Sequence, residues 1–205
     1  MRKYSRIMAV VLMLAVLTGL AGCAEKTARA DFLPTSSNDE FLVVLPEDWQ
    51  FLENWQETES VPRLTLAFNA GAEYLEPMQF NHGWGYYTDE TKEEITAFVA
   101  CGVHPLDAQP DLPQLTDTDG AVRLVWQAEP SEFSLTAYAY DVWQQQTCGS
   151  TLPEEILHTE IAVAEDGSFS LLADEHSYVY VIDAKWQTDE VAGLGGDCVW
   201  AFYVE

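Results

Sequence analysis

The chain has 205 residues, with 34 Asp and Glu against 9 Lys and Arg, which gives a formal net charge of −25 at pH 7. A surface this acidic repels phosphate backbones and anionic membrane surfaces, so the composition argues against nucleic-acid binding and against membrane attachment through charge. Seven Trp, nine Tyr and nine Phe provide more apolar mass than a disordered chain carries, so we expect a folded domain with its own core.

Residues 1–22 have the pattern of a secretory signal peptide. Arg2, Lys3 and Arg6 precede an apolar run over residues 7–17, and small residues follow it. The run is too short to span a bilayer stably, which takes about 20 residues. We therefore expect this segment to direct the chain out of the cytoplasm.

Cys23 stands where a lipoprotein signal places its cysteine. The sequence LAGC at residues 20–23 resembles the bacterial lipobox, and this resemblance implies that Cys23 carries a diacylglycerol thioether and becomes the mature N-terminus. Several acyl chains on one residue are enough for lasting membrane attachment. An ordinary signal peptide with an incidental cysteine is the alternative. The expected location is the extracytoplasmic face of the cell membrane, with the lipid as the membrane contact.

Residues 23–40 are polar and contain Pro34, Ser36 and Ser37, a composition typical of a flexible tether. We expect one domain to follow over residues 41–205, because the remaining length suits a single hydrophobic core.

Short runs that are bounded by turn residues and rich in β-branched and aromatic side chains predict strands along most of this domain. The alternation is clearest over residues 178–186, where apolar side chains share one face and Asp183 and Lys185 the other. Two stretches, 47–55 and 88–97, predict short helices. The predicted strands are 64–68, 121–127, 133–140, 167–172, 178–186 and 198–204.

This pattern predicts an all-β fold, an immunoglobulin-like antiparallel β-sandwich. The sequence ADEHSYVY at residues 173–180 resembles the approach to the immunoglobulin F strand, D-x-x-x-Y-x-C, with Tyr180 in place of the cysteine. The resemblance assigns Tyr178 a structural role as a tyrosine corner, whose hydroxyl bonds back to nearby backbone. It also implies that the usual disulfide between the sheets is absent.

A wider resemblance covers residues 61–205. It is carried by the segments VPRLTLAF, GWGYY, CGVHPLD, AVRLVWQAEPSEFSLTAY and DGSFSL, and most specifically by YVYVIDAKW and CVWAFYVE near the end. In this order they resemble a domain of uncharacterised lipoproteins from Gram-positive bacteria, and similar domains end some membrane sensor metallopeptidases on their outer side. The resemblance implies the fold and the extracytoplasmic location of the domain, and it implies no particular activity.

Three cysteines remain after lipidation, and an oxidising location favours at least one disulfide. We predict a bridge between Cys101 and Cys148 that leaves Cys198 reduced, because an immunoglobulin-like strand order starts the last strand at the end opposite to Cys148. The two pairings with Cys198 stay open, since spacing alone does not choose among three thiols.

No motif in the sequence carries catalytic chemistry. The four histidines form no H-E-x-x-H, there is no G-x-S-x-G, and the glycines at 193–196 open no helix that would bind phosphate. The DTDG at 117–120 lacks the further oxygen ligands of a calcium loop and predicts a turn. We expect no enzyme activity, no metal and no cofactor; an envelope enzyme without a recognisable motif is the alternative.

An aromatic stretch over residues 80–87 is the first candidate for binding. Trp84, Tyr86 and Tyr87 could stack on a sugar or a peptide if they were exposed, or could close one end of the sandwich if they were buried. Burial is the favoured interpretation. Exposure would make the protein a carbohydrate-binding lipoprotein, which is the alternative function.

An acidic loop over residues 187–197 is the second candidate. It carries Asp189, Glu190 and Asp197, and we expect it to emerge at the same end of the sandwich as the connection 129–132. Loops on a rigid sandwich are common recognition sites, and an acidic loop suits a cationic ligand. The sequence therefore predicts a lipid-anchored extracellular binding or scaffolding module. Its expected partner is an envelope protein or a cell-wall glycan, and not a nucleic acid.

Overall fold

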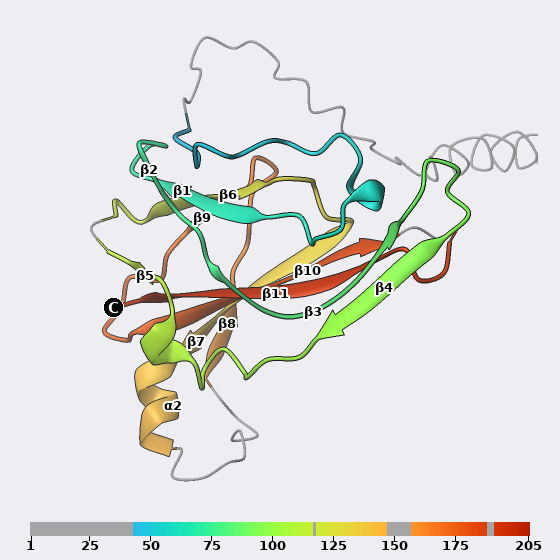
Figure 1. Cartoon of the computed structure of the whole chain (residues 1–205). Helices are drawn as coiled ribbons and strands as arrows, with labels where there is room; N and C mark the ends of the chain where they lie inside the picture. Colours follow the sequence, from blue (N-terminus) through green and yellow to red (C-terminus); the bar gives the residue numbers. More distant parts are fainter. Residues whose placement is uncertain (1–42, 117, 147–156, 188–190) are drawn as a thin grey trace, which may run out of the picture. The chain divides into compact units, whose positions relative to one another are not determined.

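A computed structural model describes residues 43–116, 118–146, 157–187 and 191–205 (Figure 1). The expected signal peptide and tether, Cys23, Cys148, Asp189 and Glu190 lie outside these residues. Within the described ranges there is no helix with the length and apolar character that crossing a membrane requires.

The fold is all-β, with two sheets that pack face to face as a sandwich (Figure 1). The smaller sheet has the strand order β2 (Glu73–Leu75), β1 (Leu64–Phe68), β6 (Ala121–Trp126) and β9 (Ser168–Ser170). The larger sheet has the order β4 (Ile95–Ala100), β3 (Met78–Tyr87), β11 (Gly195–Val204), β10 (Tyr178–Gln187), β7 (Glu132–Ala139) and β8 (His158–Glu160), and β5 (Gln114–Leu115) pairs with β11 in parallel.

The pairings are those of an immunoglobulin-like sandwich with an insertion. Strands β1, β6 and β9 take the places of A, B and E in one sheet, and β7, β10 and β11 take those of C, F and G in the other. The chain between β1 and β6 forms β2 to β5, and its β3–β4 hairpin extends the larger sheet beyond β11. This hairpin creates a new sheet edge at β4.

All six predicted strands are present, and most of their ends agree within two residues. The two predicted helices are wrong. Residues 88–94 form a turn and Ile95 begins β4, while the stretch 47–55 contains only the start of a 3₁₀ turn, η1 (Trp55–Glu57). The helix α2 (Tyr140–Gln146) and the 3₁₀ turn η2 (Gln109–Asp111) were not predicted.

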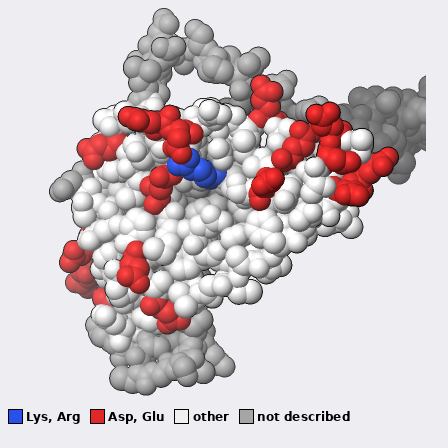
Figure 2. Space-filling model, in the orientation of Figure 1, with Lys and Arg blue, Asp and Glu red and all other residues white. Residues whose placement is uncertain are grey.

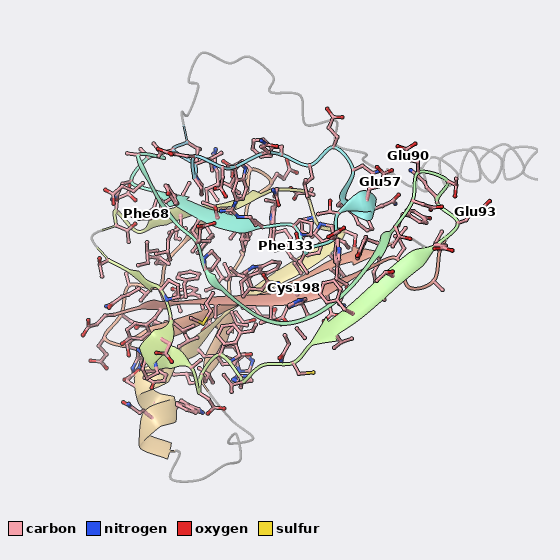
Figure 3. All side chains as sticks on the ribbon, viewed as in Figure 1. Glu57, Phe68, Glu90, Glu93, Phe133 and Cys198 are labelled. Carbon is pink, nitrogen blue, oxygen red and sulfur yellow. The ribbon has the colours of Figure 1, made fainter. Side chains whose placement is uncertain are left out.

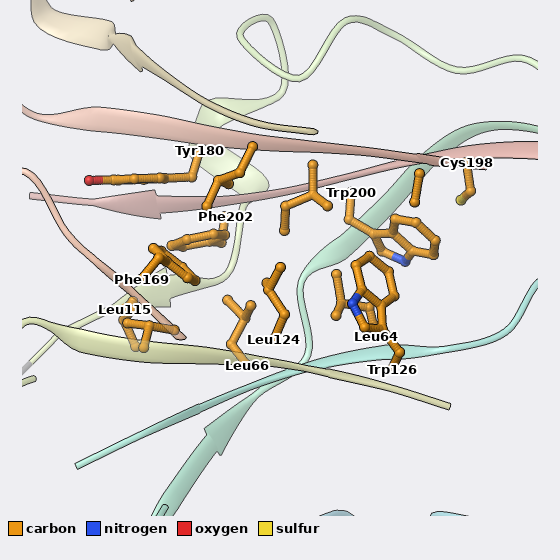
Figure 4. Close-up of a cluster of buried hydrophobic side chains, with 14 of the residues drawn as sticks. Leu64, Leu66, Leu115, Leu124, Trp126, Phe169, Tyr180, Cys198, Trp200 and Phe202 are labelled. Carbon is orange, nitrogen blue, oxygen red and sulfur yellow. The ribbon is translucent and has the colours of Figure 1, made fainter. Parts of the chain in front are cut away.

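Tryptophans form the centre of the core between the sheets (Figure 4). Trp186 on β10 is fully buried, and its ring centroid lies 5.9 Å from those of Trp126 and Trp200. Its indole nitrogen donates to the carbonyl oxygen of Ala128 at 3.2 Å. Because Trp126 belongs to the smaller sheet and the other two rings to the larger one, these contacts join the sheets.

A second apolar cluster covers part of the outer face of the larger sheet. Val179 and Val181 on β10 are packed with Leu106, Tyr140 and Trp143, which come from α2 and from the chain before η2. This explains why the first half of β10 is buried on both faces, while the alternation predicted for this strand is visible in its second half.

Tyr178 is buried, but its hydroxyl does not bond to backbone as the tyrosine-corner assignment implies. It donates to the carboxylate of Asp174 at 2.7 Å, and burial, with this bond second, raises the pKa of Tyr178 to about 12. The bond to upstream backbone is made two residues later, where the hydroxyl of Tyr180 accepts from the amide of Leu172 at 2.8 Å.

We expect Tyr180→Phe to cost more stability than Tyr178→Phe. Tyr180 is fully buried, and removal of its hydroxyl leaves the Leu172 amide unpaired, which costs about 1–2 kcal/mol. Removal of the Tyr178 hydroxyl costs about 1 kcal/mol or less, because water can bond to the exposed carboxylate of Asp174 in its place. Urea unfolding of both variants measures the difference. A larger loss for Tyr178→Phe would contradict this assignment.

Candidate binding surface

The β3–β4 hairpin is fixed to the sandwich through Trp84. This side chain is 1% exposed, its ring centroid lies 5.7 Å from that of Trp186 and 5.6 Å from that of Trp55, and its indole nitrogen donates to the carbonyl oxygen of Thr58 at 2.8 Å. The expected burial of this aromatic stretch is therefore confirmed at Trp84. A ring in this position does not stack on a ligand.

The other two aromatic candidates are half-buried. Tyr86 packs against the core on the same side of β3 as Trp84, and Tyr87 lies under the ammonium group of Lys92, which is 5.8 Å from its ring centroid. The three aromatic residues therefore do not form the exposed platform that carbohydrate stacking would need.

The loop between β10 and β11 is shorter and more tightly packed than its sequence indicated. β10 continues to Gln187, β11 begins at Gly195, and Leu194 is buried. A Cβ atom on Gly85 would lie only 1.8 Å from the carbonyl oxygen of Gly193, so the loop approaches β3 where only a glycine leaves space. The described part of the loop therefore packs against the sandwich.

Asp197 lies within β11 and not in the loop. Its directly opposite neighbour on β10 is Lys185, and on β3 it is Gly83. Lys185 also forms an ion pair with Glu132 on β7, which is the main cause of its raised pKa. Nearby Asp183 has a pKa raised by burial first and by Asp197 second. These groups form a mixed-charge row on the sheet.

Three connections share one end of the sandwich, here named the loop end: residues 88–94, 127–131 and 191–194. The register places them together, because Glu132 pairs with Lys185 and Gly195 pairs with both Gln187 and Gly85. The expectation that the β6–β7 and β10–β11 connections emerge at the same end is confirmed. The β3–β4 hairpin adds a third loop that the sequence analysis did not place there.

Carboxylates gather at the tip of this hairpin, residues 88–94. Figure 3 shows Glu90 and Glu93 there, with Glu57 of η1 nearby, and Figure 2 shows acidic side chains concentrated over the same region. Lys92 lies within the tip and is paired with Glu57, with 3.1 Å between Nζ and Oε1. The exposed Glu94 adds to the negative charge. The tip is therefore a local source of negative potential.

Asp89 has a structural role within the tip. Its carboxylate accepts from the hydroxyl of Thr91 and, at 3.3 Å, from the amide of Glu93. The bond from Thr91 is the main reason that the pKa of Asp89 is lowered. With Asp89 shaping the turn, Glu90, Glu93 and Glu94 are the carboxylates that the tip presents to solvent.

β4 is the outermost strand of the larger sheet, and its surface is apolar and uncharged. Residues 95–103, ITAFVACGV, contain no charged side chain. Val99 is 76% exposed, Phe98 37% and Val103 59%. Figure 2 shows an uncharged surface along β4 next to the acidic tip. An exposed apolar strand at a sheet edge is a site where further chains pair.

The cysteines do not form a bridge within the described residues. Cys101 is exposed just after β4, and Cys198 is buried in the core, where burial raises the pKa of its thiol to about 12. A thiol held in this neutral form is a poor nucleophile. The predicted Cys101–Cys148 bridge involves a residue outside the described ranges and stays a prediction.

Two shallow depressions of about 310 and 430 Å³ lie beside β9 and share Ala121 and Ser168. Both are at the Ala121 end of β6, away from the loop end, where β6 finishes at Trp126. Arg123, which lines the first, donates to Asp166 at 2.6 Å. In the part of the chain that the structure describes, no three His, Cys, Asp or Glu side chains are grouped to hold a metal ion.

Comparisons of the chain with known protein families, with curated proteins and with solved structures found no match. The candidate surface therefore stands on geometry: the acidic tip of the β3–β4 hairpin and the bare edge of β4. This edge was not predicted, because the acidic stretch TDETKEE at residues 88–94 has the composition of the first turn of a helix. The β-branched and aromatic run ITAFV directly after it was the signal for a strand.

We expect Trp84→Ala to destabilise the protein by about 3–5 kcal/mol, because it removes a large buried side chain from between β3 and the core. Tyr87→Ala is the matched control, because this half-buried side chain is the last residue of β3, three positions from Trp84, and it should cost about 1 kcal/mol. Chemical denaturation measures both. Equal losses would mean that Trp84 does not anchor the hairpin.

Proposed function

We propose that this protein is a lipid-anchored binding module on the extracytoplasmic face of the cell membrane, which holds a cationic polypeptide partner at the loop end. The signal-like N-terminus and Cys23 support the placement. The sandwich supports the role in binding, because folds of this type present loops on a rigid frame.

The observation that carries the proposal is the contrast between the hairpin tip and the strand that follows it. The tip presents Glu90, Glu93 and Glu94, whereas residues 95–103 carry no charge. Negative charge attracts a basic partner over long range, and an apolar surface beside it provides contact area once the partner arrives. Neither feature alone would specify a site.

The burial of Trp84 favours a protein partner over a glycan. Sugar recognition by stacking needs an exposed aromatic face, and the largest ring of the candidate stretch is 1% exposed. A polypeptide can use the backbone groups and the small apolar side chains of β4, which remain accessible.

We expect neutralisation of the tip to weaken the binding of a basic probe. The variant Glu90→Gln/Glu93→Gln/Glu94→Gln should bind fluorescein-labelled hexalysine about five- to tenfold more weakly than the wild type. This decrease corresponds to the loss of three surface ion pairs that contribute about 0.3–0.5 kcal/mol each. Fluorescence anisotropy at low and at physiological salt measures the affinity, and the difference should shrink as salt rises.

The matched control variant has the same net charge as the tip variant but keeps the three glutamates of the tip. Glu47, Glu165 and Glu175 are exposed outside residues 88–94, and their replacement by Gln removes three charges elsewhere. An equal loss of affinity in this control would show that attraction is spread over the surface, and the loop end would then not be the site.

The proposed anchor is tested separately. Cys23→Ser should leave the protein either in soluble fractions or unprocessed at its full length, because the lipid-bearing side chain is gone. Membrane fractionation with mass spectrometry of the mature N-terminus checks this. Retention of a normally processed mutant at the membrane, to the wild-type extent, would refute lipidation.

A further inference from the structure

We propose that the partner adds an extended strand to β4, with its backbone paired to that edge and a Lys or Arg beside the hairpin tip. This inference rests on the proposed function and names the conformation and the chemistry of the segment that the protein binds. It follows from the register of the β3–β4 hairpin, from the lack of a partner strand at β4 among the described residues, and from the distribution of charge around this strand.

The register shows which backbone groups of β4 are free. The amide of Thr88 donates to the carbonyl oxygen of Glu94 at 3.1 Å, and β3 and β4 are antiparallel from Tyr87 opposite Ile95 onward. Since bonded pairs alternate along such a ladder, even-numbered residues from 96 to 100 face β3. The N–H and C=O groups of Ile95, Ala97 and Val99 therefore face outward, about 6.8 Å apart.

No other described strand pairs with this outward edge, because β4 ends the order of the larger sheet. Three backbone positions with both donor and acceptor free match the spacing of a second strand in either direction. A docked strand would satisfy these groups with its own N–H and C=O groups, so the geometry provides affinity that does not depend on side-chain identity.

Among the residues that the structure describes, each of the other sheet edges carries a charge or a backbone contact, and none of these lies along residues 95–100 of β4. β2 carries Glu73 at its outer edge, and β8 ends in Glu160. At β9 the amide of Ala164 donates to the carbonyl oxygen of Ser168 at 2.8 Å, which occupies the first residue of that strand. Proteins use charges, prolines and covering segments to prevent edge pairing. Within the described residues β4 therefore differs from the other sheet edges, and this difference favours it as the edge where a further strand pairs.

Side chains around β4 define what the docked segment can carry. On the face of the sheet that points away from the core, Val99 lies opposite Gly83, which has no side chain to cover it. A Cβ atom built on Gly83 would lie 3.9 Å from Val99 Cγ2. On the opposite face Phe98 meets the ring of His82 at 5.5 Å between centroids. Both faces offer apolar neighbours, so the segment fits best with β-branched residues opposite residues 97–99.

Charge complementarity selects a basic segment over a second copy of this chain. The acidic tip directly precedes β4, so a Lys or Arg at the adjoining end of the docked strand would be attracted to Glu90, Glu93 and Glu94. A second copy brings the same net charge of −25 and no cation along residues 95–103. The two copies would repel each other on approach.

The test uses two labelled peptides, acetyl-KKVTVTVT-amide and acetyl-VTVTVTKK-amide, which together cover both strand directions. Fluorescence anisotropy measures binding to the wild-type protein. We expect one of the two to bind more tightly, and we expect N-methylation of alternate backbone amides in that peptide to reduce its affinity at least tenfold, because N-methylation removes donors and leaves the charge unchanged.

Two variants of the protein test the edge itself. In Val99→Pro the lost N–H faces outward, so the ladder to β3 stays intact, and Val99→Lys places a charge on the edge. Both should reduce affinity at least tenfold with the melting temperature held within a few degrees. Val103→Lys, the same change at an exposed valine beyond β4, should retain most of the affinity.

The outcomes separate this inference from the proposed function. If the N-methylated peptide binds as well as its parent while tip neutralisation still weakens binding, strand pairing is wrong and the acidic loop end remains. If binding needs β4 but is unaffected by the tip charges, the cationic partner is wrong. If sedimentation shows a dimer that Val99→Lys dissolves, the edge belongs to a second copy, and the inference is overturned.

Discussion

The contact between Trp84 and Trp186 is the one on which the candidate surface depends. Trp186 belongs to a central strand of the sandwich, and it also touches Trp126 from the facing sheet and Trp200 from the next strand. Trp84 brings the inserted hairpin into the same cluster. Each ring of this size removes some 150–250 Å² from water, so burial of Trp84 offsets part of the entropy lost in ordering the ten-residue strand β3, and the pairing of β3 with β11 accompanies it.

Two consequences follow from this attachment. The hairpin is an ordered extension of the larger sheet and not a free arm, so the edge of β4 has a defined register and its outward backbone groups have fixed positions. The loop at residues 191–194 approaches β3 where Gly85 leaves space, which brings this loop close to the β3–β4 hairpin. A binding segment therefore meets a preformed surface, which lowers the ordering cost of association.

The sequence was sufficient for the parts of the fold in which one strand carries its own evidence. In β10 the alternation of apolar and polar residues over 182–186 reflects a strand with one buried and one open face. The aromatic run of β11 and the Asp-Gly turn before β6 were equally local signals. These features gave the correct strands and the correct sandwich, because turn chemistry and burial pattern agreed at each of them.

The candidate surface could not be predicted, because it depends on contacts between distant residues. Acids followed by a lysine at 88–94 have the composition of a helix start, and only the pairing of Ile95 to Ala100 with β3 makes the segment a turn and an edge strand. Asp197 looked like a loop residue until Gly83 and Lys185 placed it in β11. Tyr178 and Tyr180 exchanged roles for the same reason: the partner of a hydroxyl is set by the chain that packs above it.

The most direct test of this structure is residue-resolved amide hydrogen exchange of the free protein, measured by NMR. Thr96 and Phe98 donate to β3, whereas Ala97 and Val99 face outward on the same strand. We expect slow exchange at the first two and exchange close to that of an unstructured peptide at the other two. Uniformly fast exchange over residues 95–100 would show that the hairpin is not anchored, and uniform protection would show that the edge is already covered; either result would contradict the binding edge described here.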